Sequence, residues 1–245
     1  MHPIKMKIEV WSDIMCPYCY IGKLNYEKAL EQFQYKDQVE IEWKAFQLNP
    51  DLPGKGKGIP VMDYLHNTAG LPEENVKKMN DQIAALAKEC GVTSNLENAI
   101  AANSLDAHRL VKLAATKRLD SEVMFLLSKA YFEEAKDYSD PKVLIEIGVS
   151  AGLDKNEVEN LLSNDDYAYE VKQDIQEAGN LGFDTVPTFL FNRKHALVGS
   201  QPSGAFLKTL QTAFFKWQKQ DLPQMEESLN VTKGRSCAAD GTCEI

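Results

Sequence analysis

The clearest hydrophobic patterns of the sequence lie near its start. Apolar and polar residues alternate along residues 6–11 and 39–45, which is the period of a β-strand. Between them, Tyr26, Ala29 and Phe33 belong to one apolar helical stripe, so we expect a helix from Pro17 to about Tyr35. This order predicts a strand–helix–strand unit, long enough for a right-handed crossover between parallel strands.

The middle of the chain shows only helical patterns. Residues 49–60, rich in proline, glycine and lysine, read as a linker, and every strong pattern from about residue 61 to 182 is helical. Cys90 ends one apolar stripe just before Gly91, so it is predicted to be a buried core thiol. The segment therefore predicts an all-helical block of roughly half the chain.

Strand patterns return only after residue 182. Residues 188–191 and 195–198 flank a short polar loop, which predicts an antiparallel hairpin, and a helix with one apolar face follows residues 199–203. Beyond Pro223 the chain turns polar and predicts an exposed, flexible tail. The whole chain predicts an α/β domain with a helical insertion. Residues 1–55 are the N-terminal half of that domain, 56–182 the insertion, 183–222 the C-terminal half and 223–245 the tail.

The strongest chemical motif follows the first predicted strand. Cys16 and Cys19 enclose Pro17 and Tyr18, and proline suits the first position of a helix. A thiolate at a helix N-terminus is stabilised by unpaired N–H groups and the helix dipole, so we expect a lowered pKa for Cys16. Cys19 lies one turn further on, where the two sulfurs can close a disulfide. The motif therefore predicts thiol–disulfide exchange.

Two other interpretations of this cysteine pair compete with exchange. The cysteines could be unrelated core residues, or they could be half of a zinc site. A four-cysteine zinc site needs a second close pair, and Cys237 and Cys243 are separated by five residues rather than the usual two to four. The strand before the motif and the helix after it favour redox chemistry over a metal site or simple packing.

Composition narrows the choice of partners and compartment. The net charge of −9 and the absence of a basic cluster disfavour a nucleic-acid partner. No apolar run approaches the roughly 18 residues of a membrane-spanning helix, and the first residues do not resemble a signal peptide. We therefore expect a cytoplasmic protein without a membrane partner, where a cysteine pair more plausibly cycles than braces the fold.

Four sequence landmarks, taken in order, resemble one family. They are residues 11–19 (WSDIMCPYC), 103–109 (NSLDAHR), 186–189 (VPTF) and 199–202 (GSQP). Together they look like thioredoxin-fold proteins of the DsbA superfamily. Within it they resemble the FrnE-like branch, related to 2-hydroxychromene-2-carboxylate isomerases and kappa-class glutathione transferases. The resemblance implies a thioredoxin fold with the all-helical domain inserted between its βαβ and ββα halves.

The same resemblance assigns roles to residues at the centre of the predicted site. It implies that Cys16 attacks, that Cys19 resolves, and that Pro17 and Tyr18 tune the pair. It also implies a cis bond between Val186 and Pro187, with Val186 pairing to the substrate chain; cis bonds are essentially confined to proline. DsbA proteins of the periplasm carry histidine where Tyr18 stands, so we expect a less oxidising protein.

Two further pairs have open roles. Cys237 and Cys243 resemble the C-terminal cysteine pair of the FrnE-like branch, with one residue more between them, and are an auxiliary redox pair or an idle exposed pair. His108 and Arg109 could contact a ligand, but a polar helix start that holds the two domains together is favoured.

The predicted function is thiol–disulfide exchange with protein thiols and disulfides. No bound cofactor or metal is expected, and glutathione or another thiol is a candidate co-substrate. The first alternative is a glutathione-dependent isomerase or transferase; these generally have serine where Cys16 stands. The second is a non-catalytic interaction or metal-binding module. The sequence leaves open whether the protein is a monomer or a homodimer.

Overall fold

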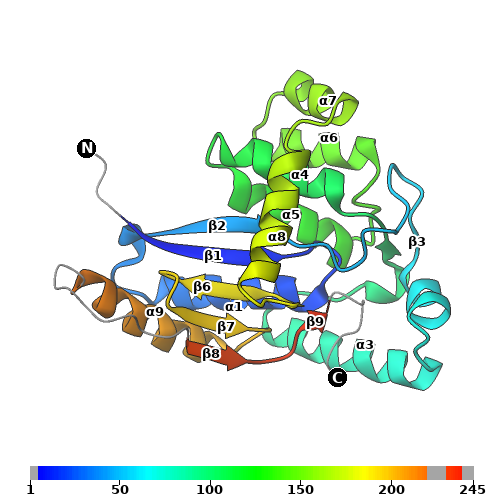
Figure 1. The fold of residues 1–245 in the computed structure, drawn as a ribbon. Helices are drawn as coiled ribbons and strands as arrows, with labels where there is room; N and C mark the ends of the chain where they lie inside the picture. Colours follow the sequence, from blue (N-terminus) through cyan, green and yellow to red (C-terminus); the bar gives the residue numbers. More distant parts are fainter. Residues whose placement is uncertain (1–4, 220–229, 239–245) are drawn as a thin grey trace.

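A five-stranded sheet forms the centre of the computed structural model, which describes residues 5–219 and 230–238 (Figure 1). The strand order is β2-β1-β6-β7-β8. The strands are β1 (Met6–Ser12), β2 (Val39–Ala45), β6 (Thr188–Phe191), β7 (His195–Val198) and β8 (Asn230–Lys233). β1 is parallel to β2 and antiparallel to β6, β6 is antiparallel to β7, and β8 runs parallel to β7.

The predicted units at the two ends of the chain are confirmed. Helix α1 (Pro17–Glu31) connects the parallel strands β1 and β2, and β6 and β7 form the expected hairpin, which helix α9 (Ser203–Gln218) follows. α1 ends at Glu31, about one turn earlier than predicted. α1 packs against α9 through ring contacts such as Tyr26 with Phe206, and Phe33, just after α1, contacts Phe214. These contacts anchor the helix that begins at the cysteine motif.

Helices dominate between β2 and residue 180, as predicted. They are α2 (Val61–Asp63), α3 (Glu73–Glu89), α4 (Leu105–Ala115), α5 (Asp120–Phe132), α6 (Pro141–Ser150), α7 (Lys155–Ser163) and α8 (Ala168–Asn180). The Asp140 side chain caps α6 by accepting from the Lys142 N–H. Two short strands, β3 (Ile59–Pro60) and β4 (Ile100–Ala101), pair within this block and tie the end of the predicted linker to it.

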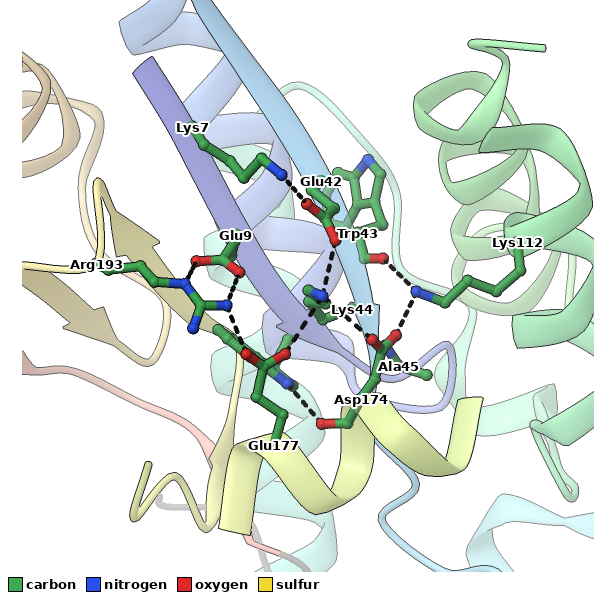
Figure 2. A network of polar contacts seen from close by, with 11 residues as sticks. Lys7, Glu9, Glu42, Trp43, Lys44, Ala45, Lys112, Asp174, Glu177 and Arg193 are labelled. Atoms are coloured by element: carbon green, nitrogen blue, oxygen red, sulfur yellow. Dashed lines mark hydrogen bonds and ion pairs between the residues drawn. The ribbon is translucent and has the colours of Figure 1, made fainter. Parts of the chain in front are cut away.

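Helix α8 is fastened to the sheet by a polar network (Figure 2). The buried Asp174 carboxylate accepts the Ala45 N–H at 2.8 Å and pairs with Lys44 at 3.4 Å and with Lys112. The Trp11 indole N–H donates to the Asp174 carbonyl at 2.9 Å. The network joins β1, β2, α4 and α8, so it connects the helical block to the strand that leads to the cysteine motif.

The prediction that the segment after residue 222 is only a flexible tail is wrong for its described part. Residues 230–233 form β8 at the sheet edge, and β9 (Cys237–Ala238) pairs antiparallel with β5 (Thr185–Val186). Cys237 is completely buried. The polar composition misled the prediction because strand pairing satisfies backbone groups without an apolar sequence pattern.

Within the two described ranges, no helix combines the length and the apolar character needed to cross a membrane.

Candidate active site

The chain turns from β1 into α1 through the cysteine motif. Cys16 occupies the N-cap of α1 in an extended conformation, and Pro17 follows at the first helical position. The Cys16 N–H donates to the Asp13 carbonyl at 3.1 Å, and the Cys19 N–H donates to the Cys16 carbonyl at 3.1 Å. Both cysteines are free thiols, 1% and 5% exposed, and Tyr18 between them is buried. The helix N-terminus expected for Cys16 is confirmed.

The loop before β6 lies against Cys16. The Val186–Pro187 peptide bond is cis, as the resemblance implied. The Cys16 Sγ donates to the Val186 carbonyl at 3.6 Å. A Cβ atom on Gly22 of α1 would lie 3.1 Å from the Pro187 ring, so glycine lets α1 pack closely against this loop. The fold thus brings Val186 into contact with the Cys16 thiol, although the two residues are 170 positions apart in the sequence.

The expected low pKa of Cys16 is not what this conformation produces. Burial raises the pKa of the Cys16 thiol well above its ordinary value, and the neighbouring Cys19 and the Asp13 charge act in the same direction. The hydrogen bond from the Cys19 N–H, which is the contribution of the helix N-terminus, lowers the pKa but is outweighed. Burial disfavours the thiolate more strongly than the helix start stabilises it. Cys16 is therefore held as the neutral thiol in this conformation.

A buried polar pair supports the loop that carries Cys16. Asp13 Oδ2 accepts the Leu48 N–H at 2.7 Å, and its Oδ1 lies 3.4 Å from His108 Nε2 without a well-aligned donor. His108 Nε2 is 2.9 Å from the Phe46 carbonyl, which can only accept, so that nitrogen carries the proton. Apart from its position in residues 11–19, nothing in the sequence singles out Asp13 as a site residue. His108 braces the loop from the helical block.

The Arg109 side chain bonds to other residues of the same chain. Its guanidinium donates to the carbonyls of Leu161, Asn164 and Asp166 at 2.5–2.7 Å and to the Asp106 carboxylate at 2.7 Å. These bonds hold the end of α7 and the turn into α8 against α4. His108, which contacts Phe46 and Asp13, agrees with the favoured interpretation that this helix start holds the two domains together. The Arg109 bonds differ from it, because their partners all belong to the helical block.

An apolar hollow opens beside the start of α1. Met15 and Pro17 form its edge at the cysteine motif, and residues of the helical block complete it. Its principal lining residues there are Val61, Tyr64, Leu65, Met79, Ile83 and Tyr131. The helical insertion therefore supplies an apolar wall next to the thiol pair.

The other cysteines differ from their predicted settings. Cys90 is only half-buried at the C-terminal end of α3, where its Sγ donates to Asn25 Oδ1 at 3.7 Å, and burial raises its pKa. It is not the core thiol that the helical stripe predicted, because the helix ends there. Cys237 is disulfide-bonded and buried. Cys243 lies outside the described residues.

Groups of three or more histidine, cysteine or acidic side chains placed to hold a metal ion do not occur in the described part of the chain.

Comparison with known proteins gives the family. Residues 7–211 match the family model of the DSBA-like thioredoxin domain. The chain is 31% identical to the probable DsbA oxidoreductase SCO1869 from Streptomyces coelicolor, with a TM-score of 0.80 and coverage of 98% of this chain and 99% of the other. It is 26% identical to YwbO of Bacillus subtilis over 187 residues, covering 75% of this chain and 85% of YwbO.

Two more distant structures share the fold. The first is a 2-hydroxychromene-2-carboxylate isomerase, at 17% identity and a TM-score of 0.59, covering 89% of this chain and 100% of the isomerase. The second is the cytosolic disulfide reductase DsbM from Pseudomonas aeruginosa, also solved with GSH, at 14% identity and a TM-score of 0.56, covering 88% of this chain and 100% of the reductase. With the geometry above, the matched residues show that this chain belongs to the DSBA-like thioredoxin domain family.

Proposed function

We propose that the protein is a thiol–disulfide oxidoreductase that exchanges disulfides with protein substrates through Cys16 and Cys19. The observation that carries the proposal is the placement of Cys16 at the N-cap of α1, with Cys19 one turn further on. The Val186 carbonyl lies 3.6 Å from the Cys16 sulfur. The similarity to a DsbA oxidoreductase at 31% identity supports the same reaction class.

The proposed reaction moves two electrons between the enzyme and its substrate. The Cys16 thiolate attacks one sulfur of a substrate disulfide, forms a mixed disulfide and releases the other sulfur as a thiolate. Cys19 then attacks the Cys16 sulfur, closes the enzyme disulfide and releases the second substrate thiolate. Two glutathione molecules can return the enzyme to the dithiol, becoming oxidised glutathione. The reverse sequence oxidises a substrate dithiol.

Surrounding residues are proposed to assist this exchange. Pro17 and Tyr18 tune the pair, and the Val186 backbone and Pro187 receive the substrate chain. The apolar hollow beside Met15 suits an apolar side chain near the substrate cysteine. The Cys237 disulfide, together with Cys243, remains a proposed auxiliary redox pair.

Retention of both cysteines favours exchange over glutathione-dependent isomerisation. A glutathione isomerase needs one group at the helix start to face the glutathione sulfur, and has no use for a resolving thiol. Exchange needs both thiols, and this chain keeps both at the required spacing.

Three single variants test the proposed roles. Cys16→Ser should abolish reduction of insulin by glutathione, because serine cannot attack a disulfide. Cys19→Ser should leave the first attack intact and accumulate a mixed disulfide visible by mass spectrometry. Cys90→Ser, which alters a half-buried thiol outside the motif, is the matched control and should retain activity. Full insulin reduction by Cys16→Ser would refute the proposal.

The direction of exchange follows from the potential of the pair. Equilibration in glutathione redox buffers, followed by alkylation and peptide mass spectrometry, measures it. A value near roughly −270 mV identifies a reductant, and one near about −180 to −120 mV an isomerase or oxidant. Thiols that never pair, or a stable glutathione adduct on Cys16, would instead favour the glutathione-dependent alternative.

A further inference from the structure

The C-terminal segment pairs with the strand that precedes Pro187. In the antiparallel register of β5 and β9, Val186 lies opposite Cys237 and Thr185 lies opposite Ala238. β9 is the strand that pairs with β5 among the described residues. Ser236 and Cys237 are buried in this arrangement. The proposed function assigns this backbone to a substrate, so the chain itself occupies the edge where a substrate would bind.

Val186 connects this pairing to the reactive thiol. Its carbonyl receives the Cys16 thiol at 3.6 Å, while its backbone takes part in the ladder with β9. An extended peptide that adds a strand to a sheet edge needs the same unpaired backbone groups. Two strands cannot occupy one edge together, so β9 and a substrate strand exclude each other at Val186.

We propose that residues 234–238 are a built-in competitor of the substrate, which caps the Thr185–Val186 edge until an extended polypeptide displaces it. This inference rests on the proposed function and adds the mode of substrate binding and its control. The cap pairs with Val186, whose carbonyl contacts a thiol that is only 1% exposed in a protein whose reaction needs contact with another sulfur. The burial that raises the Cys16 pKa fits the same closed state.

Residues 234–238 are held by a few hydrogen bonds at their start and by a short strand at their end. The Gly234 N–H donates to the Val198 carbonyl at 2.5 Å, and the Arg235 carbonyl accepts the Ser200 N–H at 2.6 Å. β9 itself pairs over two residues, whereas β8 pairs with β7 over four. β9 can therefore separate from β5 while β8 keeps the segment close to the sheet.

Gly234 offers a way to detach the cap without altering the site. A Cβ atom there would lie 2.7 Å from the Ser200 carbonyl oxygen and 2.4 Å from Gln201 Nε2. Gly234→Val should therefore push the segment off its seat, leaving the sequence of the cysteine motif and of residues 185–187 unchanged. Gly204→Val is the matched control, because a Cβ atom on Gly204 meets nothing within 4 Å.

The primary measurement is binding of fluorescein-labelled insulin B chain whose cysteines are alkylated, so that no exchange can occur. We expect Gly234→Val to bind it at least about tenfold more tightly than the unmodified protein and Gly204→Val, as for an edge that is free in roughly one-tenth of molecules. Hydrogen exchange of residues 185–186 and 235–238 should accelerate in Gly234→Val only. Faster exchange with unchanged binding would overturn the proposal.

A second measurement uses a peptide rather than a fold-sensitive variant. A synthetic peptide of residues 233–238, with serine for Cys237, should compete with the labelled B chain for the unmodified protein. Absence of competition at millimolar peptide would count against the cap. Insulin reduction separates the two proposals. If the protein reduces insulin but Gly234→Val binds the labelled B chain no more tightly, only the cap is refuted. If Gly234→Val binds more tightly but the protein has no exchange activity, only the oxidoreductase proposal is refuted.

Discussion

At the scale of single residues, burial decides the chemistry of Cys16. The helix start stabilises a thiolate, and the hydrogen bond from the Cys19 N–H does lower the pKa. Removal from water has the larger effect and raises the pKa. In this conformation burial therefore outweighs the helix start, and Cys16 is held as the neutral thiol.

Asp13 provides a test of the charges around this thiol. Burial is the main reason for the raised pKa of Cys16, and the Asp13 carboxylate adds to it. Asp13→Asn keeps an acceptor for the Leu48 N–H but removes the charge. We expect the Cys16 pKa to fall, measured by thiolate absorbance near 240 nm against pH, and alkylation at pH 7 to quicken.

The control for this measurement is Asp165→Asn, which changes an exposed carboxylate in the turn between α7 and α8. It should leave the titration unchanged. A Cys16 pKa that rises or stays constant in Asp13→Asn would show that the carboxylate does not act on the thiol through its charge.

At the scale of secondary-structure elements, α8 depends on one buried carboxylate. Asp174 is 5% exposed and holds the Ala45 N–H and two lysines, which come from β2 and α4 (Figure 2). Removing one partner of a buried polar group leaves the others desolvated and unpaired. The attachment of α8 to the sheet therefore depends on this carboxylate.

Asp174→Ala should lower the free energy of unfolding by about 2–4 kcal/mol. Asp174→Asn should cost less, because it retains an acceptor for the Ala45 N–H. Urea denaturation followed by circular dichroism measures both, with Glu170→Ala on the exposed side of α8 as the control. Equal stability of Asp174→Ala and the unmodified protein would contradict the proposed fastening.

At the scale of the whole molecule, ion pairs across the sheet make stability depend on pH. Burial raises the pKa of Glu42, but hydrogen bonds from Lys44 and Lys7 prevail and bring it from 4.5 to about 2. A carboxylate with a lowered pKa stabilises the fold above its unfolded-state pKa. This contribution is complete above about pH 4.5 and disappears as the pH falls toward 2.

Glu42→Gln should therefore lower stability at pH 7 and have little effect near pH 2. Because about a third of the Glu42 side chain is exposed, solvent screening reduces the loss at pH 7 to about 1–2 kcal/mol. Thermal unfolding between pH 2 and 7 checks this, with Glu40→Gln, exposed on the same strand, as the control. A loss that is constant across this range would exclude the charge as its origin.

The sequence alone determined the local elements and the chemistry of the cysteine motif. Periodicity predicted β1, β2, the hairpin and the flanking helices, because side-chain alternation is a local property. Cys16 and Cys19 were recognisable from spacing, and the resemblance supplied Pro187. The Asp140 side chain caps α6 in the same local way, since a cap depends only on nearby residues.

Only the tertiary structure decided how distant segments meet at the site. β8 and β9 pair through backbone groups that every residue carries, so a polar segment gave no sign of them. The burial of Cys16 and Cys237 likewise results from neighbours far along the chain. Local patterns state which face of an element is apolar, whereas the pairing of edges and the exposure of a thiol depend on what the completed fold places against them.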